Sequence, residues 1–389
     1  MHNDGMGLGR IVAIALTIGV MQSGDARAQC GVEVTAGLQF PLGIALSNQM
    51  NLLISESGTA GVLHSGRISI VGLDGIRRTL LDGLPSASND VGDPSGPAGL
   101  VMRGRTIYLA IGIGDAIQVV TPDSPVTVGN PNPAAPIFSS VLAIHFSAHV
   151  ERTTAGLSLT AADYDTLADG HTVKLSNGSG DEITIALVAN FPDYVPNPLP
   201  TAPDSVRGSN PFDLELIGDQ LYVTDGGRNV VWQADIHTGA FATLAAFDPV
   251  PNPTGVGAPV VEAVPTGIRE FEGQLFVTLF RGFPFPPGVS VVERIDPSTG
   301  LHAPVLTGLR SAIDVWVGDD QHTSLFVLEH GSGALLPPFS GPGSLTRRDA
   351  AGSTVVANCL GRPTSMVRDE RSGAFYITEL VSGRVVKVP

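Results

Sequence analysis

The chain has 389 residues, of which 43% are hydrophobic and only 15% are charged. Its 47 glycines and 30 prolines are typical of a protein built from strands and turns, and it is too apolar to be disordered. The formal net charge of −15 argues against binding to nucleic acid or to anionic membranes.

Residues 1–28 have the features of a secretory signal. A basic residue precedes an apolar run over residues 11–21, and Ala26-Arg27-Ala28 has the small-residue pattern of a cleavage site. The run is shorter than the about 20 residues that span a bilayer, and no second run of this kind follows. We therefore expect a secreted or periplasmic protein, without a membrane span, that is cleaved near Ala28.

Two cysteines, Cys30 and Cys359, follow this segment. An exported protein can form a disulfide. However, the strand register given below places them at opposite ends of neighbouring outer strands. We therefore expect no bond and interpret Cys359 as a small buried apolar residue. A lipid anchor on Cys30 is an alternative, although Gln29 stands where a small residue is required.

Six segments of similar form recur with a period near 50 residues. Each is a short apolar strand that ends in a turn, and the copies are 50–58, 105–115, 219–227, 273–282, 323–331 and 373–383. A repeat of this period that contains only strands indicates a β-propeller.

Each repeat also supplies other strands of a four-stranded blade, most with alternating apolar and polar residues. The expected innermost strands are 41–46, 96–102, 210–216, 264–271, 311–317 and 362–368. The expected third strands are 66–75, 141–146, 229–239, 289–300, 343–352 and 383–389. The expected outer strands are 77–84, 182–188, 239–247, 302–309 and 353–360.

The last blade lacks an outer strand, and the amino-terminal end of the mature chain can supply it. Residues 32–38 have the same form as the other outer strands, so we expect them to pair with 383–389. This pairing closes the ring and leaves no free sheet edge. The predicted fold is all-β, a single six-bladed β-propeller over residues 29–389; a seven-bladed ring is the alternative.

The second blade is interrupted by two insertions, at about 116–137 and 148–181. Within the second we predict a short helix over 159–170, with Thr160 as its N-cap. A proline-rich stretch, 191–204, then leads to the third blade. Long structured loops of this kind often carry function.

The stretches 209–247, 264–300 and 306–317 resemble the ScyD/ScyE family of secreted propellers, and GFPFPPG (282–288) is the most specific element. The resemblance covers nearly the whole mature chain. That family belongs to the wider group of NHL-like and SMP-30/gluconolactonase-like six-bladed propellers. The resemblance implies an architecture and an extracytoplasmic location rather than a particular chemistry.

An acidic residue ends the second strand in five repeats: Glu56, Asp115, Asp225, Glu329 and Glu379. Together with Asn210, Asp213 and Asp314 at the starts of inner strands, these groups are expected at one end of the central channel. Such oxygen ligands suit Ca²⁺ or another divalent metal, in a position resembling the metal site of SMP-30-like lactonases. The alternative, which their recurrence favours, is that the carboxylates cap turns by accepting backbone N–H bonds.

The aromatic loop, residues 280–288, opens onto the same face. Phe280, Arg281, Phe283 and Phe285 lie among prolines that hold them in place, so we predict a site for an aromatic or peptide ligand. The alternative is a plug that covers the channel mouth.

His330 is the histidine best placed for acid–base chemistry, and Asp314 is a second catalytic candidate. The sequence has no nucleophile elbow, phosphate-binding loop or dinucleotide fingerprint. A propeller that binds a small molecule or a protein on its loop face is therefore the favoured function. The alternatives are a metal-dependent hydrolase of lactonase type, with Asp213, Asn210 and Asp314 as ligands, and a quinoprotein dehydrogenase.

Overall fold

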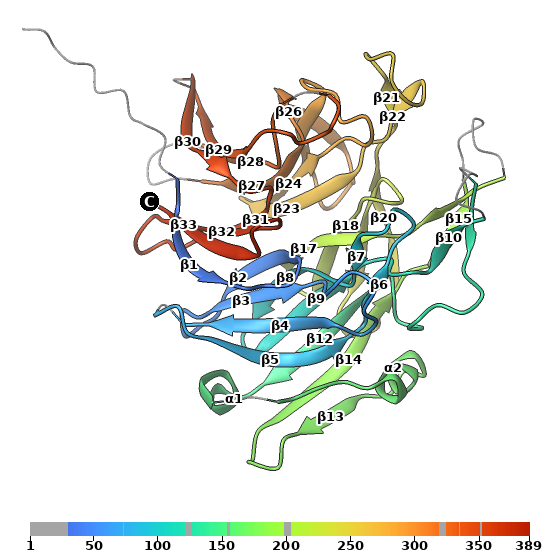
Figure 1. The fold of residues 1–389 in the computed structure, drawn as a ribbon, viewed down its shortest axis with the longest axis vertical. Coiled ribbons are helices and arrows are strands. Elements are labelled where there is room, and N and C mark those ends of the chain that lie inside the picture. Colours follow the sequence, from blue (N-terminus) through green and yellow to red (C-terminus); the bar gives the residue numbers. More distant parts are fainter. Residues whose placement is uncertain are drawn as a thin grey trace, which may run out of the picture.

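The computed structural model describes residues 30–72, 74–120, 126–153, 156–197, 204–318, 324–333, 335–350 and 352–389. The expected secretory signal lies outside these residues. Six antiparallel sheets stand around a central axis, which confirms the predicted six-bladed propeller (Figure 1). Neither of the two described helices is long and apolar enough to cross a membrane.

The first three blades follow one another along the chain. Blade one contains β2 (Pro41–Leu46), β3 (Leu52–Glu56), β4 (Gly66–Val71) and β5 (Arg77–Leu84). Blade two contains β8 (Pro97–Arg103), β9 (Thr106–Ile111), β12 (Ser140–Phe146), β14 (Glu182–Asn190) and β13 (Val173–Ser176). Blade three contains β17 (Pro211–Ile217), β18 (Gln220–Asp225), β19 (Val230–Asp235) and β20 (Phe241–Ala246).

The last three blades complete the circle. Blade four contains β23 (Pro265–Phe271), β24 (Gln274–Leu279), β25 (Ser290–Ile295) and β26 (His302–Leu309). Blade five contains β27 (Ala312–Val317), β28 (Leu325–Glu329), β29 (Gly343–Asp349) and β30 (Gly352–Leu360). Blade six contains β31 (Pro363–Arg368), β32 (Phe375–Glu379), β33 (Arg384–Val388) and β1 (Val32–Ala36).

Blade six joins the two ends of the described chain. β1 pairs antiparallel with β33, with Val32 opposite Lys387 and Ala36 opposite Arg384 (Figure 1). The predicted closure of the ring is therefore confirmed. The carboxyl-terminal strand has partners on both sides, so its backbone offers no free edge.

The apolar core lies between neighbouring blades. The middle strands are covered on both faces, so they read as continuous apolar runs; every residue of β3 and β32 is buried. The outer strands are much more exposed, as most of β26 shows. The packing of blade faces against each other thus explains why the second strand of each repeat is its clearest sequence signal.

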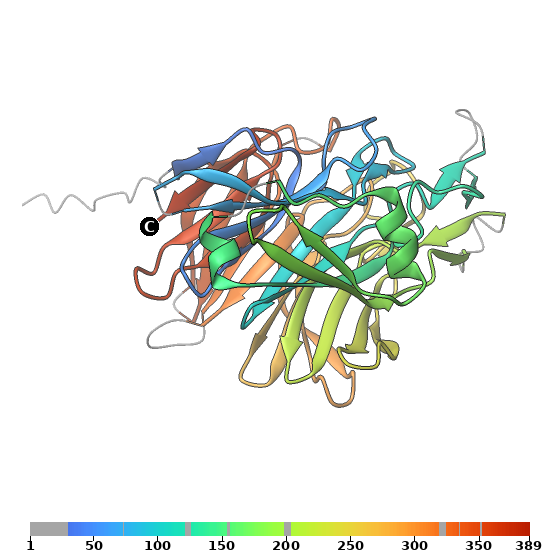
Figure 2. The ribbon, with the colours of Figure 1, turned by 90° about the horizontal axis from the view of Figure 1, so that it is seen from below.

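The insertions of blade two lie outside the ring (Figures 1 and 2). Residues 116–137 include a hairpin of β10 (Ile117–Val119) and β11 (Thr127–Gly129). The second insertion forms α1 (Ala148–Thr153), α2 (Ala161–Ala168) and β13, which adds a fifth strand that the sequence did not predict.

The helix α2 begins as predicted, directly after Thr160. The backbone N–H and hydroxyl of Thr160 donate to the Asp163 carboxylate at 2.8 and 2.7 Å. The buried Tyr164 hydroxyl donates to the Gly83 carbonyl at 2.5 Å, which anchors this helix on blade one.

Three of the described connections between blades contain a short two-stranded ribbon. They pair β6 (Ala87–Ser88) with β7 (Pro94–Ser95), β15 (Tyr194–Pro196) with β16 (Val206–Gly208), and β21 (Val250–Pro251) with β22 (Val260–Val261).

The expectation that Cys30 and Cys359 do not bond is wrong, because the structure joins them in a disulfide. Cys30 lies two residues before β1, and Cys359 lies near the end of β30. Successive strands of a sheet rotate by about 20–25°, so an outer strand is steeply inclined to the inner strand of its blade. The end of the outer strand of one blade can therefore approach the start of the outer strand of the next blade. The sequence prediction treated the strands as parallel to each other and did not include this twist.

Candidate ligand-binding channel

The inner strands surround the axis, and neighbouring strands lie very close together at their third residues. These residues are Gly43, Gly99, Asp213, Gly267, Asp314 and Ser365. A Cβ atom on Gly99 would lie 2.5 Å from the Cα of Asp213, and one on Gly267 would lie 2.6 Å from the Cα of Asp314. The third residue of an inner strand must therefore be glycine where the next inner strand has an aspartate at its own third position.

Arg269 forms a buried ion bridge at this narrow level. Its Nη1 lies 2.7 Å from Oδ2 of Asp213, and its Nη2 lies 3.0 Å from Oδ2 of Asp314. The three side chains are 13%, 8% and 1% exposed, respectively. The bridge thus links blades three, four and five next to the axis.

The two aspartates also join adjacent inner strands. Asp213 accepts the backbone N–H of Ile268 at 3.2 Å, and Asp314 accepts that of Met366 at 2.8 Å. Burial raises the pKa of Asp314 to about 7, against the opposing effect of Arg269 and with a further increase from Asp213. Burial alone would lower the pKa of Arg269, but the surrounding carboxylates raise it overall.

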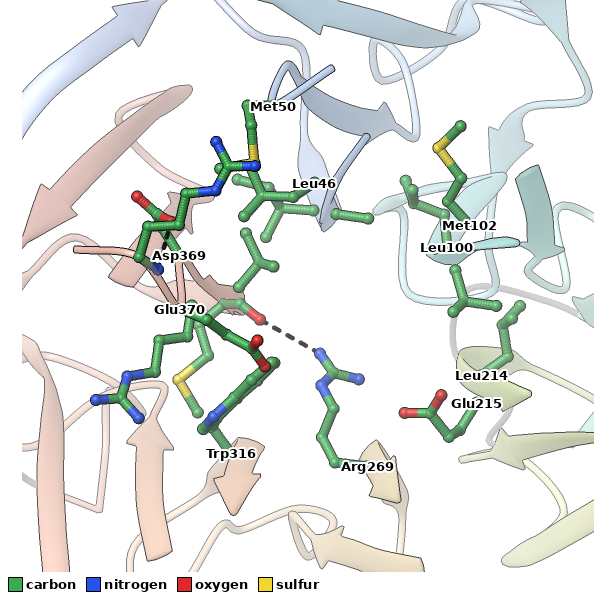
Figure 3. Close-up of a pocket in the computed structure, with 17 residues that line it drawn as sticks. Leu46, Met50, Leu100, Met102, Leu214, Glu215, Arg269, Trp316, Asp369 and Glu370 are labelled. Carbon is green, nitrogen blue, oxygen red and sulfur yellow. Dashed lines mark hydrogen bonds between the residues drawn. The ribbon is translucent and has the colours of Figure 1, made fainter. Parts of the chain in front are cut away.

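The larger cavity, about 420 Å³, lies at the carboxyl ends of the inner strands and is here termed the strand-end cavity (Figure 3). Its walls are mainly apolar, and they include Leu46, Met50, Leu100, Met102, Leu214, Trp316 and Met366. Glu215 and Arg269 lie at its base, and residues 368–371 contribute charged groups at its rim. In Figure 3, Arg269 points into the cavity between Glu215 and Trp316.

A smaller cavity, about 190 Å³, lies at the amino ends of the inner strands and is here termed the strand-start cavity. Asn210 and His330 line it, with apolar neighbours that include Phe212 and Ile313. It shares no lining residue with the strand-end cavity. The structure therefore brings Asn210 and His330 to one site and places Asp213 and Asp314 in the separate ion bridge.

His330 is almost fully buried and neutral at physiological pH. Its Nδ1 lies 2.9 Å from the carbonyl oxygen of Pro363, so Nδ1 carries the proton and donates it. Burial, helped by Arg362, lowers the pKa of His330 to about 4 despite the raising effect of the Pro363 hydrogen bond. Its other ring nitrogen is consequently a proton acceptor.

Four of the five acidic residues at the ends of second strands occupy equivalent positions. Glu56, Asp225, Glu329 and Glu379 accept the backbone N–H of Gln39, Asn210, Arg310 and Gly361 at 2.5, 2.7, 2.7 and 2.8 Å, respectively. Each carboxylate thus caps the segment that leads into the inner strand of its own blade.

Asp115 is not the equivalent residue in blade two, which corrects the sequence alignment of that repeat. The equivalent position is Ile111, opposite Pro97 in the register, and Leu279 occupies it in blade four. Asp115 instead accepts the backbone N–H of Ala134, at 2.9 Å, within the 116–137 insertion.

The aromatic loop packs mainly against the protein itself. The Phe285 ring lies 4.7 Å from that of Phe339, and the Phe280 ring lies 5.8 Å from each of them. Arg281 is 6% exposed, and its Nε donates to the Val289 carbonyl at 3.2 Å. Of the four residues predicted to bind a ligand here, Phe283 alone is strongly exposed, at 50%.

Within the described ranges, no group of three or more His, Cys, Asp or Glu side chains could hold a metal ion. At the two aspartates proposed as ligands, the positive charge comes from Arg269.

The strand-end cavity was missed at the sequence level. Its lining residues occupy the later positions of inner strands, where most of them read as ordinary apolar core. Glu215 and Arg269, two charges within inner strands, were the available signal.

No protein-family model matches the chain, and neither does any curated protein sequence. Solved structures resemble it along most of its length. A PQQ-bound aldose sugar dehydrogenase from Streptomyces coelicolor is 13% identical, with a TM-score of 0.50, over 91% of this chain and 95% of that one. What it shares with this chain is the six-bladed fold.

Two further structures are similar at lower scores. A putative glucose dehydrogenase from Thermus thermophilus is 15% identical, with a TM-score of 0.49, over 92% of this chain and 98% of that one. A gluconolactonase from Xanthomonas campestris is 12% identical, with a TM-score of 0.47, over 92% and 88%.

Proposed function

We propose that this protein is an exported propeller that binds a small organic molecule in the strand-end cavity. The volume of about 420 Å³ carries this proposal, because pockets for small ligands commonly measure about 300–1,000 Å³. Such pockets combine apolar walls with a few convergent polar groups, as Glu215 and Arg269 provide here. Export is supported by the signal-like residues 1–28 and by the disulfide, which forms in oxidising compartments.

The lining suits an apolar ligand body. Met50, Met102 and Met366 are flexible and polarisable, so they can adapt to a bound ring or chain, and Trp316 offers a large flat surface. The aromatic loop is a less favourable site because Phe280, Phe285 and Arg281 are already engaged within the protein. We therefore place the ligand in the strand-end cavity, which differs from the surface favoured by the sequence.

Tryptophan fluorescence tests this placement, since the chain has only two tryptophans. A screen of small molecules for thermal stabilisation should yield binders that change the emission of Trp316. The Trp316→Phe variant should lose this change. The Trp232→Phe variant should keep it, because Trp232 is buried in blade three.

A blocking variant provides an independent check. Ala45→Phe would place a ring in the cavity that Ala45 lines, and it should abolish thermal stabilisation by every binder. Binders that stabilise Ala45→Phe and wild type equally would contradict the proposal.

A hydrolase acting at the strand-start cavity is the second candidate function. Neutral His330 favours it, because its unprotonated ring nitrogen could accept a proton from water, and Asn210 could orient a substrate in the same cavity. Hydrolysis of sugar lactones that is lost in His330→Phe would support this function. Metal analysis of the purified protein tests whether Ca²⁺ or another divalent ion takes part.

A further inference from the structure

We propose that the ligand of the strand-end cavity is an organic cation whose ammonium group pairs with Glu215. This inference rests on the proposed function and names the chemical class of its ligand. Three features of the cavity support it: the carboxyl groups around Arg269, the hydrogen bonds of Arg269, and the position of Trp316.

Around Arg269, at the base of the cavity, carboxyl groups outnumber cations, and of these carboxyl groups Glu215 lines the cavity itself. Arg269 is surrounded by Asp213, Asp314 and Glu215, and both of its terminal nitrogens bind the aspartates. Nη1 also donates to the Ile268 carbonyl at 2.6 Å, so little of the guanidinium remains for an incoming anion. The base therefore disfavours an anionic ligand.

Glu215 is the carboxylate that remains for a ligand. It accepts the backbone N–H groups of Leu216 at 3.0 Å and Glu270 at 3.3 Å, and among the described residues no cationic side chain donates to it. Burial raises the pKa of Glu215, while Arg269 acts in the opposite direction. A bound ammonium group would restore the electrostatic stabilisation that this carboxylate loses through burial.

The rim does not supply the missing positive charge. Arg368 and Arg371 there are matched by Asp369 and Glu370. The guanidinium of Arg368 lies over the ring of Phe326 at 5.5 Å, where it is engaged in a cation–π contact. The charged side chains that line the cavity balance, three acidic against three basic, so its excess of negative charge comes from Asp213 and Asp314 behind Arg269. The net charge of the chain, −15, would also attract cations toward it.

Trp316 provides a flat apolar surface for the body of the ligand. It lines the same cavity, and Figure 3 shows it on the side of Arg269 away from Glu215. Indole faces attract cations and pack well against apolar rings. A ligand with an ammonium group on a short apolar body can therefore satisfy the carboxylate and the wall together.

Three probes of matched size test the proposal: 2-phenylethylammonium, neutral 2-phenylethanol and anionic 3-phenylpropanoate. Titration calorimetry at about pH 7.5, where the amine is protonated, should show the cation binding at least about tenfold more tightly than the alcohol. The anion should bind least well. Glu215→Gln should remove the preference for the cation while leaving the affinity for the alcohol nearly unchanged.

Glu270→Gln is the matched control, because it removes an equal charge from the next inner strand without altering the lining of the cavity. It should keep the preference for the cation. A pH titration gives a second test. The affinity for the cation should rise with pH as Glu215 ionises, in wild type and also in Asp314→Asn, which removes the other carboxyl group with a raised pKa beside Arg269. The affinity for the alcohol should not rise.

The possible failures are distinguishable. If the alcohol binds in the cavity and the cation binds no more tightly, the charge inference is wrong and the proposed function stands. If none of the probes binds at millimolar concentration, the charge inference is wrong, and the thermal-stabilisation screen with Ala45→Phe decides the proposed function separately. If Glu215→Gln keeps the full preference for the cation, Glu215 is not the recognition group and the inference is overturned.

Discussion

At the scale of single residues, Arg269 has the largest structural role near the axis. Its side chain is largely buried and forms ion pairs with carboxylates of blades three and five, which flank its own blade. Both aspartates also accept backbone N–H groups from an adjacent inner strand. Removal of the arginine would therefore leave two buried carboxylates without a cation.

Arg269→Met should lower the free energy of unfolding by about 3–5 kcal/mol, the usual effect of removing one partner from a buried ion pair. Urea denaturation measures this loss. Arg294→Met is the control, since Arg294 is exposed on blade four, and it should change stability little. Equal stability of the two variants would show that the bridge contributes no net stability.

Asp314 should make the protein less stable as pH rises from about 4 toward about 7. Its pKa is raised from an ordinary 3.8 to about 7, so in this window the folded state binds a proton that the unfolded state lacks. His330 has the opposite effect on stability. Because its pKa is lowered from an ordinary 6.5 to about 4, stability rises with pH between these two values. The difference between wild type and Asp314→Asn therefore isolates the aspartate.

Urea midpoints measured across this pH range provide the test. The stability of wild type relative to Asp314→Asn should decrease as pH rises. Asp248→Asn, which alters an exposed residue, should show no such trend relative to wild type. A constant difference for Asp314→Asn would mean that its pKa is ordinary.

At the scale of elements, the repeated carboxylate cap connects the first two strands of a blade. In blade three, Asp225 accepts the N–H groups of Asn210 and Arg228 and the indole N–H of Trp232. The side chain ends β18 and fixes the segment that leads into β17. The cap therefore positions an inner strand relative to its neighbour.

Asp225→Ala should lower the free energy of unfolding by about 1–3 kcal/mol, because buried donors are left without an acceptor. The fluorescence of Trp232 should also change, since its indole N–H loses its partner. Asp248→Ala again serves as the exposed control. Unchanged stability together with unchanged fluorescence would contradict a capping role.

The sequence predicted the elements well wherever the blade repeat is uninterrupted. Buried strands such as β3 and β32 repeat at regular spacing, so their number and order were clear. In blade two the inserted residues obscured the alignment, which explains the error at Asp115 and the unexpected β13. Side-chain contacts between neighbouring inner strands have no local sequence signature, so the bridge at Arg269 could not be predicted.

At the scale of the whole molecule, two interactions close the ring. The strand β1 pairs with β33, and the disulfide connects residue 30 to residue 359 in blade five. The bond encloses a loop with a sequence separation of 329 residues. It therefore restricts the unfolded chain strongly, which is the main way in which such bonds stabilise proteins.

Reduction of the disulfide should lower the free energy of unfolding by about 2–4 kcal/mol. Thermal unfolding of wild type with and without a reductant measures this effect as a drop in Tm. The Cys30→Ser/Cys359→Ser variant should match reduced wild type and should not respond to the reductant. A Tm that is the same for oxidised and reduced wild type would contradict a stabilising role.

The bond between residues 30 and 359 also affects how the protein tolerates proteolysis. If a protease cuts once at any exposed turn between these positions, the two fragments remain covalently tied. Their sheets stay packed around the axis, so a nicked molecule can keep its shape and its cavities. Durability of this kind would suit the export proposed above, because peptidases are common outside the cell.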